Sequence, residues 1–259
     1  MILRRITEHV KAQNWFAVGL DFLIVVVGVF IGIQVSNWNG ERQDNALSAE
    51  YLQRLEFDIA LEQARWDKAA DYFSTARQYG LAAMEGFQKP ADQLDDQFLV
   101  NVYQASQVWF VLPNRATFDE LSSTGRIVLI EDAELRTALS NHYVRVDALG
   151  FTLNQNSQYR RVARLNIDQR IQQQIRDKCG DQWVTDDRNF YYVVLPTQCE
   201  IEVPDELLRT EISKLRRNEE VEQELRFQMS VLDAQLGTLK NTMDTGDATL
   251  AKIKEAQNK

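Results

Sequence analysis

The sequence predicts a mainly α-helical protein: one N-terminal transmembrane helix, then an extracytoplasmic bundle of long helices with a small irregular, β-prone insert. Three observations lead to this fold class. A 20-residue apolar run lies near the N-terminus, two later segments repeat apolar residues at helical spacing, and only 11 Gly and 4 Pro occur in 259 residues. So few turn-forming residues argue against a β-sandwich or a β-barrel.

The apolar run covers residues 16–35, of which 15 are hydrophobic. At roughly 1.5 Å per residue such a helix reaches about 30 Å, the thickness of the hydrocarbon core of a bilayer. Trp15 and Trp38 flank the run, as amphipathic rings do at the two membrane interfaces. We therefore predict a transmembrane helix over residues 15–38. A buried helix of a soluble core is the alternative, but its apolar run is usually shorter.

Residues 1–14 determine the expected orientation of this helix. They carry Arg4, Arg5 and Lys11 against a single acidic residue, so the positive-inside rule predicts a cytoplasmic tail. Residues 39–259 would then form a helical domain outside the cytoplasm, with 26 basic and 36 acidic residues. A cleaved signal peptide is the alternative, but the run exceeds an ordinary signal core and no Ala-x-Ala site follows it.

Two long amphipathic helices are expected in the outer domain, because apolar residues recur at steps of three and four. Both rows resemble coiled-coil seams, and each could equally face the core of an antiparallel bundle. We prefer the bundle, because the chain offers three or more helices of its own. The first row, between residues 46 and 88, is Leu52, Leu55, Ile59, Glu62, Trp66, Ala69, Phe73, Ala76, Gly80, Ala83 and Phe87, and the second is Leu225, Met229, Leu232, Leu236, Leu239 and Met243.

The segment after the first helix contains several breaks. Residues 89–97 hold a proline and several carboxylates and predict a helix boundary, after which helix is expected over residues 93–110. Beyond Pro113, Thr117 and Glu120 fit a capping box that opens a short helix.

The short helix is expected to end at Ser123, with Gly125 in the left-handed conformation. An extended stretch over residues 126–130 follows. Asp132 then offers an N-cap for a helix through Leu153 that can continue toward residue 178, with an interruption near residues 154–157.

The least helical part of the chain is the predicted insert, residues 177–204, with the β-prone run 190–195. It contains the only two cysteines, Cys179 and Cys199. A disulfide between them is expected in an oxidising exported compartment and would contribute about 3 kcal/mol. Two buried free thiols are the alternative. The spacing is unlike Cys-x-x-Cys, and no histidine lies near enough in sequence to suggest zinc.

Catalytic signals are sparse. The two histidines, His9 and His142, lack a metal-ligand partner at helical spacing, and no hydrolase, zinc-protease, dinucleotide or P-loop pattern occurs. The net charge of −9 argues against binding of nucleic acid. We expect a non-enzyme without metal or cofactor, and a site built from carboxylates alone is the remaining enzymatic alternative.

Asp21 is the most informative residue of the predicted span, because a carboxylate in a transmembrane helix usually faces protein or water. Asp21, Val25, Gly28 and Gly32 share one helix face, and the two glycines form a GxxxG pattern that lets helices approach closely. We expect this face to bind a second copy or another membrane protein within the lipid bilayer. Alternatively, Asp21 lies shallow enough to reach the headgroups and the glycines are merely tolerated.

The run LDFLIVVVGVFIGIQVSNWNGERQ and the later segment TFDELSSTGRIVLIEDAELRTALSNHY together resemble a family of bacterial single-pass membrane proteins whose domain has no assigned function. The resemblance covers the anchor, the first outer helix and this middle segment. It implies a bacterial single-pass membrane protein, and it carries no activity and no functional residue. Together with the orientation expected from the basic tail, we predict the bacterial inner membrane, with a cytoplasmic N-terminus and a periplasmic domain.

Two classes of function follow from these features. The first is a membrane-anchored scaffold, or a sensory and interaction protein, without catalytic activity. The second is a subunit of an ion-coupled membrane machine in which Asp21 is protonated and deprotonated. Only the layout of one span, one membrane carboxylate and one exported domain supports the second class.

Overall fold

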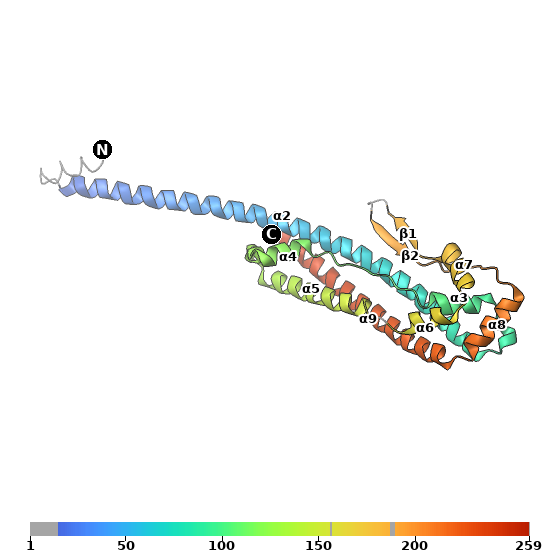
Figure 1. The fold of residues 1–259 in the computed structure, drawn as a ribbon. Coiled ribbons are helices and arrows are strands. Elements are labelled where there is room, and N and C mark those ends of the chain that lie inside the picture. The colour runs from blue at the N-terminus through green and yellow to red at the C-terminus, as the bar shows by residue number, and fades with distance from the viewer. Residues whose placement is uncertain (1–14, 156, 187–189, 259) are drawn as a thin grey trace.

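The computed structural model describes residues 15–155, 157–186 and 190–258, and the chain is mainly α-helical as predicted. One helix, α2 (Trp15–Gln88), runs without a break from the apolar run into the helical domain (Figure 1). No proline interrupts the helix between the two regions. Gly40 lies there, and a glycine inside a helix costs only about 1 kcal/mol relative to alanine.

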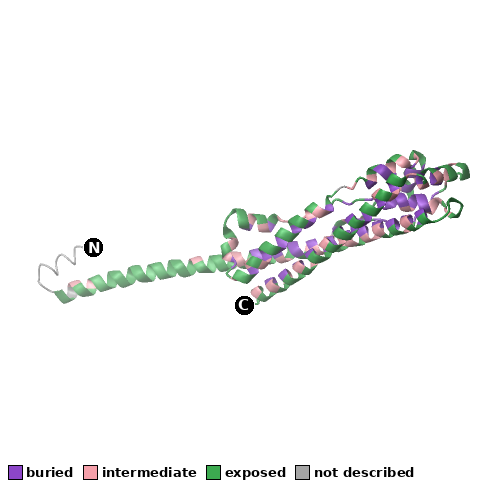
Figure 2. Ribbon diagram, turned by 90° about the horizontal axis from the view of Figure 1, so that it is seen from below, coloured by how far each residue is buried: buried purple, intermediate pink, exposed green. Residues whose placement is uncertain are grey.

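The predicted helical rows form the centre of the bundle. Every residue of the first row is buried, including Glu62 and Gly80, and the second row lies on α9 (Glu219–Gln257) with Leu236 and Met243 only partly buried. Figure 2 shows the buried positions concentrated along the inner sides of the long helices, while the N-terminal part of α2 stays exposed. A side chain at Gly80 would collide with Met229, so this glycine allows α2 and α9 to pack closely.

Helices α2 and α9 are antiparallel over most of their shared length. Gln257 of α9 donates to Glu56 (3.0 Å), and Gln88 at the end of α2 donates to Glu222 (3.5 Å). The third long helix, α5 (Ala133–Leu153), packs on α9, and Lys252 pairs with Glu134 at 3.0 Å near its start. The antiparallel bundle preferred from the sequence is therefore present within one chain.

The segment after α2 is shorter in helix than expected. A 3₁₀ turn, η1 (Ala91–Gln93), leads to α3 (Asp96–Gln104), so the predicted helix over residues 93–110 ends six residues early. Two residues beyond this end, the Ser106 carbonyl accepts from Arg160 (2.7 Å), a partner 54 residues away that the local pattern does not show.

The capping-box prediction was wrong. Helix α4 (Ala116–Ser123) lies where the short helix was expected. However, the Thr117 hydroxyl donates to Asp58 (2.6 Å). The Glu120 carboxylate accepts from Tyr51 (2.6 Å) and Arg54 (2.5 Å). Both side chains thus bind α2 rather than their own backbone.

The turn after α4 contains one confirmed and one wrong prediction. Gly125 has φ 70°, the left-handed conformation that glycine adopts most readily. The expected extended stretch is instead a 3₁₀ helix, η2 (Arg126–Leu129), whose last carbonyl accepts from Ser48 (2.8 Å). Asp132 caps α5 as predicted, accepting from the backbone N–H groups of Glu134 and Leu135.

Short elements make up the far end of the domain. After the predicted interruption come α6 (Tyr159–Asn166) and α7 (Gln169–Cys179), separated by a further break at which Asp168 caps α7. Two antiparallel strands, β1 (Gln182–Thr185) and β2 (Tyr191–Val194), pair Gln182 with Val194. Helix α8 (Asp205–Arg216) then leads into α9. The predicted β-prone insert is therefore a small hairpin.

Candidate functional site

Residues 15–46 of α2, which we call the stem, project away from the domain as an exposed apolar helix (Figure 1). None of the side chains described in the stem is buried, and Trp15 and Trp38 are 71% and 62% exposed. The stem is long and apolar enough for one membrane span. The basic residues Arg4, Arg5 and Lys11 lie outside the described residues.

On the Asp21 face of the stem, the described residues leave open space at the two glycines. A Cβ atom built on Gly28 or Gly32 would meet no described atom within 4 Å. Val25 is 40% exposed and Asp21 is half-buried. The glycine positions therefore leave room for a close neighbour, which is the geometric requirement of a GxxxG contact.

A disulfide joins Cys179 at the end of α7 to Cys199, with 5.5 Å between their Cα atoms. The buried amide of Gln104 donates to the Cys179 carbonyl at 2.7 Å, which ties α3 to the same point. The bridge thus closes the hairpin insert against the core of the far end. The two cysteines are 20 residues apart, so the bridge lowers the conformational entropy of the unfolded chain and thereby stabilises the fold.

A buried polar cluster lies where α2, α5 and the start of α4 meet. The Glu62 carboxylate accepts from the backbone N–H of Asn114 (2.8 Å) and lies 3.4 Å from His142 Nε2. Asp58 accepts from the Asn114 amide (2.9 Å) and the Thr117 hydroxyl (2.6 Å). The side chains of Glu62 and His142 are fully buried. The cluster therefore joins three segments, with Glu62 and His142 at its buried centre.

Tyr143, next to His142, shows the electrostatic effect of this cluster. Burial, with the negative charges of Glu62 and Asp58, raises the pKa of the Tyr143 hydroxyl far above its ordinary value. The ring stacks on Phe118 at 4.2 Å between centroids, and Arg115 lies over it at 5.4 Å. Tyr143 therefore stays neutral and packs as an aromatic core residue.

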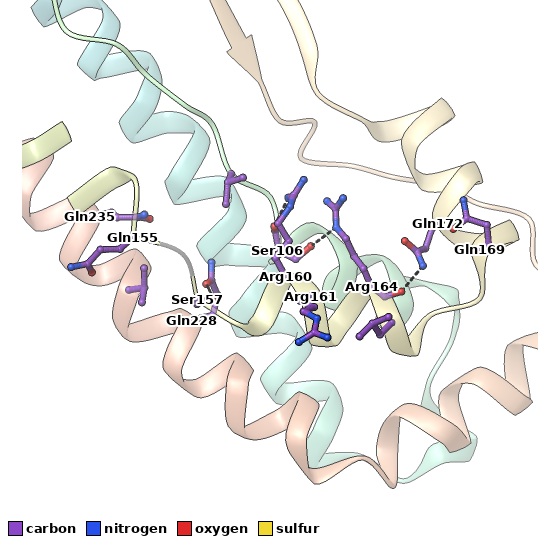
Figure 3. Close-up of a pocket in the computed structure, with 13 residues that line it drawn as sticks. Ser106, Gln155, Ser157, Arg160, Arg161, Arg164, Gln169, Gln172, Gln228 and Gln235 are labelled. Carbon is purple, nitrogen blue, oxygen red and sulfur yellow. Dashed lines mark hydrogen bonds between the residues drawn. The ribbon is translucent and has the colours of Figure 1, made fainter. Parts of the chain in front are cut away.

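A cleft of about 610 Å³ lies between α6, α9 and the loop after α3. Three arginines line it, Arg160, Arg161 and Arg164, and the remaining described lining is neutral. In Figure 3, Arg160 and Arg164 extend to the same side of α6 toward Ser106, while Arg161 extends the other way. This arrangement follows from their spacing, because residues four apart share a helix face.

Arg160 and Arg164 are held in place by hydrogen bonds to neutral groups. Arg160 donates to the Ser106 carbonyl (2.7 Å) and the Gln107 amide oxygen (3.3 Å). Arg164 donates to the same amide oxygen (3.0 Å) and lies over the ring of Tyr103 at 4.6 Å. Burial and the neighbouring Arg160 charge lower the pKa of Arg164, although the guanidinium stays protonated.

The sequence analysis identified neither the arginine cleft nor the polar cluster. A local signal existed for each: two arginines four residues apart in α6, and Glu62 as the only charged residue of an apolar row. Their partners lie 54 and 80 residues away in the chain, so spacing could not reveal them.

No protein family, curated protein or solved structure matches the chain. Within the described ranges, no group of three or more His, Cys, Asp or Glu side chains is placed to hold a metal ion. The family resemblance of the anchor and the middle segment therefore remains a prediction.

Proposed function

We propose that this chain is a bitopic protein of the bacterial inner membrane, anchored by the stem, whose helical domain serves as a scaffold or as a sensory and interaction module without catalytic activity. The continuity of α2 is the observation that carries the proposal: one helix contains both the exposed apolar stem and the buried stripe of the domain. A continuous helix connects the domain to the membrane without a flexible linker.

The proposed orientation places residues 1–14 in the cytoplasm and residues 39–259 in the periplasm. Its support is the basic tail before the span, because lysine and arginine favour the cytoplasmic side. The disulfide supports the same direction, since the periplasm is oxidising. The domain carries a net charge of −10 in the sequence, so electrostatic adhesion to anionic lipid is disfavoured.

Association through the Asp21 face, with a second copy or another membrane protein, is the proposed mode of interaction. This mode is supported by the free space beside Gly28 and Gly32 and by the Asp21 carboxylate on the same helix face. A polar group in lipid gains from a protein or water contact, and small residues let two backbones approach.

Crosslinking of the full chain in native membranes tests this mode. Gly28→Leu and Asp21→Leu are expected to reduce crosslinked oligomers or co-purified partners, whereas Gly19→Leu, on the opposite side of the same helix, leaves them unchanged. Equal yields from all three variants and the wild type contradict association through this face.

Labelling of single cysteines introduced at residues 10 and 45, in a variant that lacks Cys179 and Cys199, tests the orientation.

The ion-coupled alternative remains a prediction and has its own measurement. Asp21→Asn keeps the size of the side chain and removes the protonatable group. In proteoliposomes, proton flux that depends on the wild-type chain and falls in Asp21→Asn supports this alternative, and unchanged flux contradicts it.

A further inference from the structure

The arginine cleft has an unusual charge balance for a chain of net charge −9. Its described lining contains Arg160, Arg161 and Arg164 and no carboxylate. Among the described residues, none forms an ion pair with these arginines. The Asp181 carboxylate interacts electrostatically with Arg160 and Arg164 without a direct ion pair, and it accepts a hydrogen bond from Tyr72 at 2.8 Å. The described lining of the cleft itself is therefore positively charged.

The arginines also retain unused hydrogen-bond donors. Arg160 uses only Nη1 and Arg164 uses Nε and Nη2 toward described residues. A guanidinium has five N–H donors in a planar fork that fits a carboxylate or a phosphate. Hydrogen bonds to Gln107 and Ser106 hold both groups in place, so their orientation needs no ligand.

Another wall of the cleft is formed by residues of α9. Gln235 of α9 is 3% exposed, and its amide nitrogen donates to the Leu153 carbonyl at 3.3 Å. Its amide oxygen is buried without a hydrogen-bond partner in the described chain. Val231, nearby on α9, adds apolar lining.

We propose that this cleft binds a small organic anion, with its carboxylate or phosphate group at Arg160 and Arg164. The volume of about 610 Å³ lies within the ordinary range of small-molecule sites. The mixture of arginine, glutamine and valine side chains suits a polar ligand with a short apolar body. This inference does not depend on the membrane anchor or on the Asp21 face.

Calorimetric titration of the full chain in nanodiscs tests the proposal. The probes are citrate, L-glutamate, D-glucuronate, glucose 6-phosphate and sulfate, with glucose as the neutral comparison. We expect at least one organic anion to bind, more weakly as ionic strength rises, and glucose not to bind. Arg160→Gln or Arg164→Gln should weaken that binding about 10- to 100-fold, since each removes charge-assisted hydrogen bonds.

Arg209→Gln is the matched control, because it removes the same charge from an exposed position on α8. Val231→Trp fills the cleft from α9 and leaves the arginines intact, so it should also abolish binding even if an arginine variant folds poorly. Absence of binding by every organic anion overturns the proposal. Binding of sulfate alone, or equal weakening by Arg209→Gln and Arg160→Gln, overturns it too.

Discussion

The two halves of the helical domain differ in what holds them together. In the near half, next to the stem, α2, α5 and α9 pack as long helices, and the Asp58, Glu62 and His142 cluster joins α2 to α5 and to the start of α4. In the far half, helices of 8 to 12 residues pack against the ends of α2 and α9. Short helices are marginal alone, so the far half depends more on crosslinks and side-chain hydrogen bonds.

Removal of the disulfide is expected to have the largest effect and to act on the far half. Cys179→Ser combined with Cys199→Ser should lower the free energy of unfolding by about 3 kcal/mol. Hydrogen exchange should show lost protection in α3, α7 and the hairpin, with α5 nearly unchanged. A uniform loss of protection over both halves would mean that the domain unfolds as one unit and would remove the distinction.

Glu62→Ala tests the near half. It leaves the Asn114 N–H and the His142 ring without their partner in a dry site, so a loss of about 1–3 kcal/mol is expected in urea unfolding. Glu85→Ala, at an exposed position on the same helix, is the control and should change stability by less than about 0.5 kcal/mol. Equal effects of the two changes would contradict a structural role for the cluster.

The smallest effect concerns the cap of α7. Hydrogen bonds from the Arg170 side chain and backbone lower the pKa of the Asp168 carboxyl to about 2, below its unfolded value near 4. The stabilisation is therefore present above about pH 4 and is lost as the pH falls toward 2. Because the pair is exposed, it contributes less than about 1 kcal/mol.

Asp168→Asn keeps a good N-cap and removes the charge, so it should flatten the stability profile between pH 4 and pH 2. Thermal unfolding of both proteins across this range checks the difference. Parallel profiles for wild type and variant would show that the carboxylate adds nothing beyond its capping hydrogen bond.

The near half was more predictable from sequence than the far half, for a physical reason. A long helix repeats its burial pattern many times, so a single exception such as Glu62 does not obscure it. The wrong assignment of Thr117 and Glu120 arose because a local motif competed with partners on α2 that the sequence does not place nearby.

The far half and the arginine cleft were harder to predict from the sequence than the near half. At the break between α6 and α7, the backbone N–H of Asp168 donates to Glu211 on α8 (2.8 Å), and beyond the early end of α3 the Ser106 carbonyl accepts from Arg160. These partners lie 43 and 54 residues away in the chain, so the local pattern does not show them. The sequence shows that Arg160 and Arg164 share one helix face. Only the folded structure shows that they bind neutral groups and that the described lining of their cleft contains no carboxylate.

The unbroken path of α2 also fixes a phase between the stem and the domain. At about 100° per residue, the Asp21, Gly28 and Gly32 side of an ideal helix lies roughly half a turn from the side that carries Leu55, Ile59 and Trp66. A helix docked on the glycine side would stand behind α2, away from α5 and α9, so two copies could pair without a collision of their bundles. One residue inserted after Trp38 would turn this phase by about 100°.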